Sequence, residues 1–322
     1  IKTTFVGKES LITRPIDVYI AALSKTGVKI YKHDRKKTVP LSIESKIKPA
    51  EFFIRGDISS QFISGLLFSL PLLDKESYIY LTSPLESKGY VDMTIDILKK
   101  YNINIEILEN GFRIPKNQKY KATSFSVESD FSQAAFFLAS NLLSSNVKVS
   151  SLNINSLQPD KHILDILKCF GANICIDDNT VIVKKGSNIK SIEIDISQNP
   201  DLLPIISVIC CFCDGRSRIY GAQRLKYKES DRLSSTANAL NAIGGRITKL
   251  DDSLIIDPIK KFHKGIIDGC NDHRIVMAMS IAATASDSEI IISDAMSINK
   301  SYPNFFNDYS LLGGNANVIN FR

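Results

Sequence analysis

The sequence has few of the residues and none of the loops that usually mark a metal or nucleotide site. Its four histidines are far apart, and among its six cysteines only Cys210 and Cys213 form a C-x-x-C pair. A zinc site needs a full set of suitably spaced ligands, so we interpret the cysteines as reduced, buried thiols of a cytoplasmic protein. Neither G-x-x-x-x-G-K-[ST] nor G-x-G-x-x-G occurs. The sequence therefore supports neither a metal nor a nucleotide cofactor.

Long apolar runs and a strong charge imbalance are also absent. The longest apolar stretches, such as residues 201–213, are shorter than the roughly 20 residues that span a bilayer. The chain of 322 residues has 40 lysines and arginines against 34 acids, a net charge of +6. Without a basic run this mild excess does not predict nucleic-acid binding. A pocket for an anionic small molecule fits it equally well, and we expect neither a membrane nor a nucleic acid as a partner.

What the sequence does contain is an internal repeat. A leucine is followed four residues later by Gly or Asn and three residues after that by an aliphatic residue. Each copy predicts an amphipathic helix that ends at a left-handed residue and continues into a strand. Asn110-Gly111 then predicts a hairpin turn. The copies lie 69 to 75 residues apart, at Leu23–Gly27–Ile30, Leu98–Asn102–Ile105, Leu167–Gly171–Ile174, Leu240–Gly244–Ile247 and Leu311–Asn315–Val318.

A second element alternates with the first. Four aspartates, spaced 71 to 73 residues apart, each precede a helix-length apolar run: Asp57, Asp130, Asp201 and Asp272. An acid there is typical of an N-cap, and helices that are apolar nearly all round should be buried. The unit is then strand, helix, strand, helix and hairpin, over about 70 residues. Because the chain opens inside a unit, we expect more of the protein upstream, and two lobes at residues 1–126 and 127–322.

One segment carries an unusual concentration of charge. Residues 224–232 read RLKYKESDR, with four cations and two acids at the entrance of a predicted helix. Lys228 and Arg232 share a helix face if the helix begins by Lys228. Cations at a helix N-terminus oppose the helix dipole. The segment is therefore either an exposed, solvated first turn or a site where a bound anion offsets the cations.

Other candidate anion ligands stand at further helix entrances. Arg274 follows Asp272, Arg14 lies in the segment TRPI, and Ser59-Ser60-Gln61 opens an apolar helix. The serines are explained equally well as capping residues. Because the candidates come from different repeats, two facing lobes would gather them into one cationic cleft.

Six short motifs, in order along the whole chain, resemble those of 5-enolpyruvylshikimate-3-phosphate synthases (EPSP synthases). They are TRPI at 13–16, GDISSQF at 56–62, LESKGYVD at 85–92, KESDR at 228–232, NDHR at 271–274 and KSYP at 300–303. The resemblance implies a two-lobed inside-out α/β barrel, the enolpyruvyl transferase fold, built from repeated βαβαββ units and here N-terminally incomplete. Two alternatives stay open. One is an enzyme similar to UDP-N-acetylglucosamine enolpyruvyl transferase, which shares the fold, and the other is an inactive fragment or scaffold lobe.

The resemblance also implies an activity and its ligands. The family transfers the enolpyruvyl group of phosphoenolpyruvate to the 5-hydroxyl of shikimate 3-phosphate, releases phosphate and uses no cofactor; we expect a monomer. By matching positions, the phosphate of shikimate 3-phosphate would be held by Ser59, Ser60 and Ser87, with Tyr90 nearby and Gln61 between the two substrates. The ligands of phosphoenolpyruvate would be Arg14, Arg232, Arg274 and Lys300, with Lys228 touching both substrates.

Asp201 and Glu229 would form the acid–base pair, and Lys228 is an alternative proton donor. A carboxylate near the 5-hydroxyl can remove its proton, and a cation-rich site can bring two mutually repelling anions together. Three positions depart from the family pattern. Arg224 stands where some relatives have Asn, Gly89 replaces a frequent Pro, and the N-terminal ligand stretch has no counterpart. We therefore expect this chain alone to be weakly active or inactive.

Overall fold

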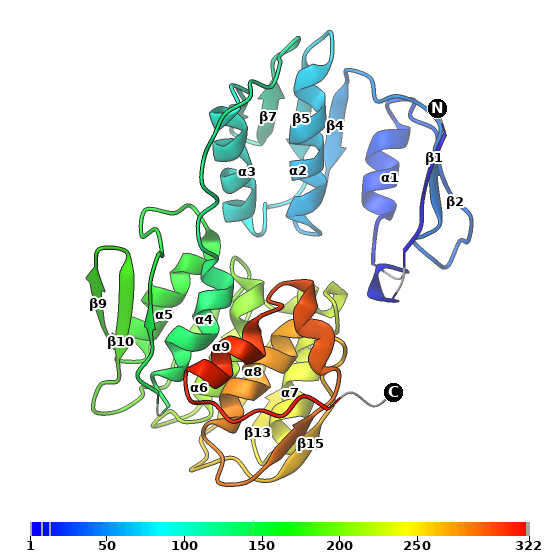
Figure 1. The fold of residues 1–322 in the computed structure, drawn as a ribbon. Coiled ribbons are helices and arrows are strands. Elements are labelled where there is room, and N and C mark those ends of the chain that lie inside the picture. The colour runs from blue at the N-terminus through cyan, green and yellow to red at the C-terminus, as the bar shows by residue number, and fades with distance from the viewer. Residues whose placement is uncertain (1, 8, 13, 144, 320–322) are drawn as a thin grey trace. The chain divides into compact units, whose positions relative to one another are not determined.

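The computed structural model describes residues 2–7, 9–12, 14–143 and 145–319. These residues form two compact units, residues 1–127 and 128–322 (Figure 1). Within the described part of the chain, no helix combines the length and the apolar character needed to cross a membrane.

Unit 1 contains two sheets with helices against them. The first sheet is antiparallel with strand order β1-β3-β2, and the second has the order β4-β5-β7-β6, in which only β4 and β5 are parallel. Figure 1 shows α2 and α3 side by side against the second sheet. The elements are β1 (Thr3–Phe5), η1 (Glu9–Ile12), α1 (Asp17–Ser24), β2 (Ile30–Lys32), β3 (Leu41–Ile43), β4 (Glu51–Ile54), α2 (Ser60–Ser69), η2 (Leu70–Leu72), β5 (Ser77–Leu81), α3 (Lys88–Lys100), β6 (Glu106–Leu108) and β7 (Gly111–Ile114).

The core of unit 1 lies between its second sheet and the two helices. Alternation along β4 turns Phe52 and Ile54 inward, where they meet Leu66 of α2 and Leu98 of α3 in one apolar cluster. The prediction that α2 is buried all round is wrong, because Phe68 on its opposite side is 46% exposed. The sheet and α3 cover one face of α2.

Unit 2 contains three sheets. Their strand orders are β8-β10-β9, β11-β12-β14-β13 and β15-β16, and the parallel pairs are β11 with β12 and β15 with β16. The elements are α4 (Phe131–Ser140), β8 (Lys148–Val149), η3 (Pro159–His162), α5 (Ile163–Cys169), β9 (Asn173–Asp177), β10 (Thr180–Lys184), β11 (Glu193–Asp195), η4 (Pro200–Leu202), α6 (Leu203–Cys210), β12 (Ser217–Tyr220), η5 (Gln223–Tyr227), α7 (Arg232–Ala242), β13 (Arg246–Lys249), β14 (Leu254–Asp257), β15 (Gly265–Ile267), α8 (His273–Ala283), β16 (Ile290–Ile292), η6 (Ala295–Lys300) and α9 (Phe305–Leu311).

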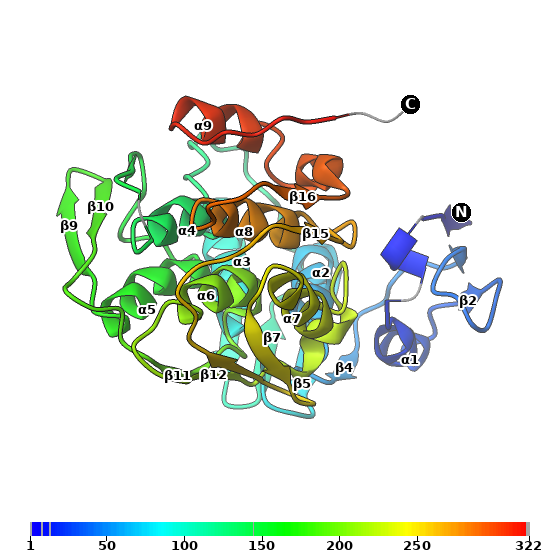
Figure 2. The same ribbon diagram turned by 90° about the horizontal axis from the view of Figure 1, so that it is seen from below.

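Buried helices form the centre of unit 2, as the apolar runs predict. Every residue of α4 and α6 is buried, and so are ten of the eleven residues of α8. Figures 1 and 2 both show α4, α6, α7 and α8 packed together; β13 lies outside them in Figure 1 and β12 in Figure 2. Sheets on the outside and helices at the centre are the arrangement that the family resemblance implies.

The strand orders confirm the repeat. The hairpin portion has one pattern in all four of its copies, β1-β3-β2, β5-β7-β6, β8-β10-β9 and β12-β14-β13. Gly27, Asn102, Gly171 and Gly244 have positive φ angles of 82°, 64°, 90° and 93°. In the fifth copy the left-handed residue is Gly313 rather than Asn315, and no strand follows among the described residues up to 319. The helix there ends two residues earlier than its leucine spacing predicts.

The predicted hairpin after β6 is present, but its turn is displaced by one residue. Leu108 pairs with Gly111, so Glu109 and Asn110 form the turn and Gly111 begins β7. Gly111 has a φ of 152°, and a Cβ atom there would lie 1.9 Å from the carbonyl oxygen of Ile79. The close approach of two strands, rather than the turn, requires glycine at this position.

The cap predictions are half right. Asp130 accepts the backbone N–H of Ser132 at 2.7 Å and Asp272 accepts that of Arg274 at 3.0 Å, so both cap their helices. Asp57 and Asp201 do not. The N-cap of α2 is Ser59.

The two aspartates that do not cap a helix bind side chains instead. Asp57 binds Arg55 at 2.6 Å and Ser83 at 2.7 Å, and the hydrogen bond from Arg55 chiefly lowers the pKa of Asp57 to about 2. Asp201 lies inside η4 and binds three cations instead. At both positions ion pairs displace the local capping bond.

The cysteine prediction also needs correction. All six cysteines are free, but only Cys210, Cys211 and Cys213 are buried. Cys169 and Cys175 are exposed because they lie on α5 and β9, at the outer side of their repeat.

Candidate functional site

Nearly all of the predicted site residues follow the strands of the parallel pairs. The segment after β4 carries Ser59, and the segment after β11 carries Asp201. Arg274 follows β15, and Lys300 follows β16. Within each repeat, paired parallel strands end at the same edge of the sheet. Within each unit, this topology brings together residues that are distant in sequence. Arg14 is the exception.

The predicted shikimate-phosphate ligands lie at two neighbouring helix entrances in unit 1. The hydroxyl of Ser59 accepts the N–H of Gln61 at 3.3 Å, so the capping role weighed for Ser59 is present. Ser60 is 9% exposed, whereas Gln61 is exposed. A helix entrance with hydroxyl and N–H donors suits an anion.

Ser87 stands at the second entrance, immediately before α3. It is 2% exposed and has a φ of 52°, a left-handed conformation that costs a non-glycine residue about 1–2 kcal/mol. Its carbonyl accepts the N–H of Tyr90 at 3.1 Å, and the carbonyl of Gly56 accepts the N–H of Glu86 at 3.2 Å. The second bond joins the loops before α2 and α3, so the Ser59 and Ser87 segments are neighbours.

Arg14 is half-buried just before α1, and its carbonyl oxygen accepts the hydroxyl of Thr38. Thr13, part of the TRPI motif, lies outside the described residues. Arg14 thus lies in the segment between η1 and α1, joined to Thr38 in the segment between β2 and β3.

In unit 2 a buried arginine is surrounded by three carboxylates. Arg232, the first residue of α7, is 1% exposed. Its Nε lies 2.8 Å from Oδ2 of Asp272, its Nη1 lies 2.6 Å from Oδ1 of Asp201, and its Nη2 lies 2.7 Å from Oε2 of Glu229. The alternative of an exposed, solvated first turn is therefore wrong for Arg232, although Lys226, Tyr227 and Asp231 of the segment are exposed. The anions that offset the cation include three carboxylates of the protein itself.

Lys228 and Arg232 do not share a helix face, because the helix does not begin by Lys228. Lys228 has extended backbone after η5, and α7 begins only at Arg232 with Asp231 as its N-cap. The two cations nonetheless meet, because both bind Asp201. The Nζ of Lys228 lies 3.3 Å from Oδ1 of Asp201.

Arg274 completes this cluster from α8. Its Nη2 lies 3.0 Å from Oδ2 of Asp201 and 3.1 Å from the hydroxyl oxygen of Ser132 on α4. Its Nε and Nη1 are buried, and neither has a hydrogen-bond partner among the described residues. Buried donors without an acceptor are costly. Arg274 therefore presents two donors that an anion can occupy.

These contacts shift several pKa values. Burial alone would raise the pKa of Asp201, but Arg274, Lys228 and Arg232 together hold it well below its usual range. Burial lowers the pKa of Lys228 against the opposing effect of Asp201. Burial, followed by the nearby Arg274, lowers the pKa of His273 to about 4. Asp201 is thus held as a carboxylate, and Lys228 is a better proton donor than an exposed lysine.

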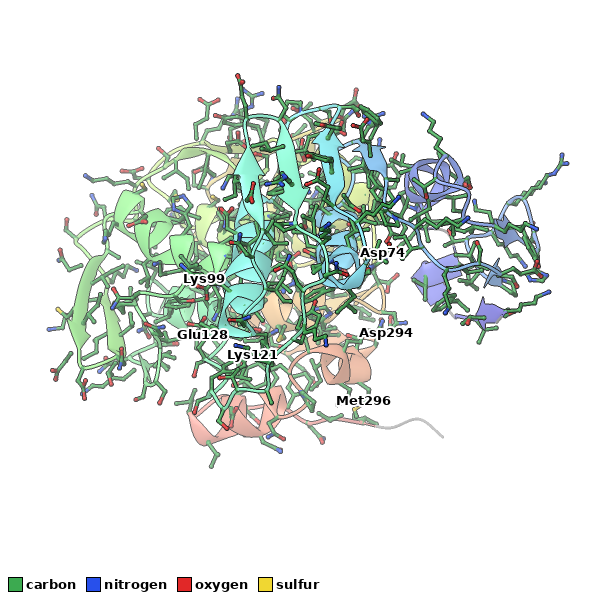
Figure 3. All side chains as sticks on the ribbon, turned by 90° about the horizontal axis from the view of Figure 1, so that it is seen from above. Asp74, Lys99, Lys121, Glu128, Asp294 and Met296 are labelled. Carbon is green, nitrogen blue, oxygen red and sulfur yellow. The ribbon has the colours of Figure 1, made fainter. Side chains whose placement is uncertain are left out.

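Lys300 is attached to the segment that carries Arg274. Its Nζ donates to the carbonyl oxygen of Asn271 at 2.6 Å. The N–H of Asn271 in turn donates to Oδ2 of Asp294 at 2.9 Å; Figure 3 labels Asp294, directly before η6. Lys300 and Arg274 are therefore held at connected positions by backbone contacts.

Two features of the cluster are missing from the sequence prediction. Asp272 is predicted as a cap only, yet its carboxylate also binds Arg232. Ser132 is not predicted at all. Its signal is positional, because Ser132, Ser59 and Arg274 each stand two residues after one of the repeated aspartates.

Among the described residues, no group of three or more His, Cys, Asp or Glu side chains could hold a metal ion. The expectation that the protein works without a metal or cofactor stays a prediction. What the arrangement offers is a buried, hydrogen-bonded set of cations beside a carboxylate that can accept a proton.

Sequence comparisons point to one family. The family model for EPSP synthase (3-phosphoshikimate 1-carboxyvinyltransferase) matches residues 1–309. The 3-phosphoshikimate 1-carboxyvinyltransferase of Clostridium novyi (strain NT) is 45% identical over 316 residues, covering 97% of this chain and 72% of the relative. That of Brachyspira hyodysenteriae (strain ATCC 49526 / WA1) is 41% identical over 316 residues, covering 97% and 74%.

Solved structures agree on the fold. An EPSP synthase from Acinetobacter baumannii matches with a TM-score of 0.77 and 26% identity, over 98% of this chain and 74% of that one. The enolpyruvyl transferase NikO from Streptomyces tendae matches with the same TM-score at 13% identity, over 98% and 73%. The second likeness concerns the fold alone.

Proposed function

The chain belongs to the EPSP synthase family, and we propose that it transfers the enolpyruvyl group of phosphoenolpyruvate to the 5-hydroxyl of shikimate 3-phosphate, with release of phosphate. The observation that carries the proposal beyond the family match is the cluster in unit 2. There Arg274 keeps two buried donors open beside the carboxylate of Asp201.

Phosphoenolpyruvate is proposed to bind Arg274, Lys300, Arg14, Arg232 and Lys228. Arg274 has the clearest support, because its Nε and Nη1 have no partner among the described residues, and each can donate to an oxygen of the phosphate or carboxylate of phosphoenolpyruvate from a different edge of the guanidinium. Arg232 differs, since each of its three guanidinium nitrogens already has a carboxylate partner. We propose that Arg232 chiefly fixes Asp201 and Glu229 in place and adds positive potential.

Shikimate 3-phosphate is proposed to bind in unit 1. Its phosphate would receive the hydroxyls of Ser59, Ser60 and Ser87 at the entrances of α2 and α3, where the helix dipoles favour an anion. Tyr90, one turn into α3, and the exposed amide of Gln61 would contact the rest of the substrate. The left-handed backbone of Ser87 supports this role, because such strain is concentrated at functional sites.

The reaction needs a proton on the methylene carbon of phosphoenolpyruvate, which makes the neighbouring carbon electrophilic. The 5-hydroxyl oxygen then bonds to that carbon while its proton passes to a base. Loss of phosphate and of one methyl proton restores the double bond. We propose Asp201 as the base, because its neighbours keep it ionised. Glu229 or Lys228 would supply the first proton, and the lowered pKa of Lys228 favours the lysine.

Three expectations remain predictions. They are a cytoplasmic location, a monomeric state, and weak or absent activity of this chain alone. The two alternative functions lose support for different reasons. The family model that matches the chain is that of EPSP synthases, and the Clostridium novyi relative is a 3-phosphoshikimate 1-carboxyvinyltransferase. A mere scaffold does not require an arginine held with two open donors.

The proposal is tested by following phosphate release from phosphoenolpyruvate, together with calorimetric titration of shikimate 3-phosphate. We expect any release, which this chain alone should give weakly if at all, to require shikimate 3-phosphate, with none when shikimate or UDP-N-acetylglucosamine replaces it. Release with the nucleotide sugar alone would overturn the proposal in favour of the related transferase. A protein that binds neither substrate would be a scaffold.

A further inference from the structure

A hydroxyl on α4 contacts the guanidinium that is proposed to bind phosphoenolpyruvate. Ser132 is 6% exposed, and its hydroxyl oxygen lies 3.1 Å from Nη2 of Arg274, a residue 142 positions away in the chain. The second partner of this Nη2 is Oδ2 of Asp201 at 3.0 Å. One nitrogen of Arg274 is thus held between a serine and a carboxylate.

The serine is itself rigidly placed. Its backbone N–H donates to the capping carboxylate of Asp130 at 2.7 Å, at the first turn of a helix that is buried along its whole length. A short side chain on such a helix end has little freedom to move. Ser132 therefore holds the end of the Arg274 side chain in a defined position.

The remaining nitrogens of Arg274 give this contact a consequence for binding. Nε and Nη1 are buried and have no partner among the described residues, so their direction is set by the contacts at Nη2. With Asp201 as the only contact, the planar group could turn about that single bond. A second contact from Ser132 fixes the plane, and with it the two directions in which Nε and Nη1 can donate to anionic oxygens.

We propose that Ser132 is a positioning residue for phosphoenolpyruvate, acting through Arg274. The inference rests on the proposed function, because it takes phosphoenolpyruvate as the anion that occupies Nε and Nη1. The repeat gives independent support. Ser132 occupies the same place after Asp130 that Arg274 occupies after Asp272 and Ser59 occupies after Asp57. The repeat that contains Asp130 thus supplies a hydroxyl at the position where the repeats of Asp57 and Asp272 carry proposed ligands.

The test compares two serine-to-alanine variants of α4. Ser132→Ala removes the contact with Arg274, whereas Ser140→Ala removes a buried hydroxyl at the other end of the helix that donates to the carbonyl of Phe137 at 2.7 Å. Phosphoenolpyruvate is titrated by calorimetry in the presence of shikimate 3-phosphate, and its KM and kcat are measured by phosphate release. Thermal unfolding of each variant is recorded alongside.

We expect Ser132→Ala to raise the Kd and KM for phosphoenolpyruvate by about tenfold, the usual effect of losing a hydrogen bond to a charged group. The KM for shikimate 3-phosphate should stay unchanged, Ser140→Ala should resemble the wild type, and Ser132→Thr should restore affinity because it keeps the hydroxyl. Unchanged phosphoenolpyruvate affinity in Ser132→Ala, or an equal loss in Ser140→Ala, would overturn the inference. If Ser132→Ala does not fold, the comparison is made between Ser132→Thr and Ser132→Cys, and equal affinities would count against it.

The same data separate the inference from the proposed function. A wild type that turns over, with a Ser132→Ala variant of equal affinity, leaves the function standing and removes the inference. A wild type that binds phosphoenolpyruvate tenfold more tightly than Ser132→Ala but releases no phosphate keeps the positioning role and removes the reaction.

Discussion

Arg232 and Asp272 form an ion pair that is closed off from solvent, with Nε and Oδ2 2.8 Å apart and side-chain exposures of 1% and 0%. Asp272 also caps α8, so a single carboxylate holds the start of one helix and the first residue of another. This pair joins α7 and α8 directly beside Asp201. The geometry of the candidate site therefore depends on it.

Asp272→Asn is predicted to lower the free energy of unfolding by about 3 kcal/mol. That is the low end of the range for breaking a buried ion pair, because Arg232 keeps Asp201 and Glu229 as partners. Urea denaturation followed by circular dichroism measures the change. Asp287→Asn is the matched control, since it breaks an exposed pair with Lys261 and should cost less than about 1 kcal/mol. Equal effects of the two variants would contradict the prediction.

His273 predicts a loss of stability in mild acid. Its folded-state pKa, about 4, lies below its ordinary value of 6.5, so the unfolded chain binds a proton in this interval that the folded chain does not. Stability should fall as the pH drops from about 6.5 to 4, by about 3 kcal/mol in total. The depressed carboxylates act at lower pH, because Asp201 and Asp272 lose their contribution only as the pH falls below about 4.

The measurement is the free energy of unfolding in urea at several pH values between 7 and 4. His273→Gln should flatten this dependence. A His273→Gln variant with the wild-type slope would show that the buried imidazole is not its source.

Asp201→Asn separates catalysis from binding. Removal of the proposed base should lower kcat by about 100-fold or more. Affinity for phosphoenolpyruvate should not weaken, because Lys228, Arg232 and Arg274 lose a competing negative charge. Phosphate release gives kcat, and calorimetry gives the Kd. A turnover rate near that of the wild type would exclude Asp201 as the base.

Substitutions of Ser87 should change the stability of the protein and its affinity for shikimate 3-phosphate independently. Ser87→Gly relieves the left-handed conformation and Ser87→Ala keeps it, so the glycine variant should be more stable than the alanine variant by about 1 kcal/mol. Both lack the hydroxyl, and both should bind shikimate 3-phosphate about tenfold more weakly. Calorimetry and thermal unfolding measure the two quantities. Wild-type affinity in either variant would remove Ser87 from the ligand set.

The repeat could be predicted from sequence because its marks are local. Each mark depends on only a few neighbouring residues: a leucine, a left-handed Gly or Asn, or an aspartate before an apolar run. The spacing of these marks predicts the βαβαββ unit. Local marks fail where long-range partners compete. Asp201 has the register of a cap, yet three cations take its carboxylate.

The contacts within the candidate site could not be predicted in the same way. Ser132 and Arg274 are 142 residues apart, and nothing in their immediate neighbours indicates that they touch. The exposure of Arg232 was likewise open, because a charged helix entrance looks the same in sequence whether it is solvated or buried. Motif resemblance identifies the residues, and the packing of α4, α6, α7 and α8 supplies their geometry.

The most direct test of the account is a calorimetric titration of phosphoenolpyruvate into the wild type and Arg274→Gln, with shikimate 3-phosphate present. Arg216→Gln, which alters an exposed arginine paired with Asp257, serves as the control. Arg274→Gln is predicted to weaken binding by at least about tenfold, while Arg216→Gln should bind as the wild type does. Equal affinity in all three proteins would contradict the claim that the buried arginine of α8 binds phosphoenolpyruvate.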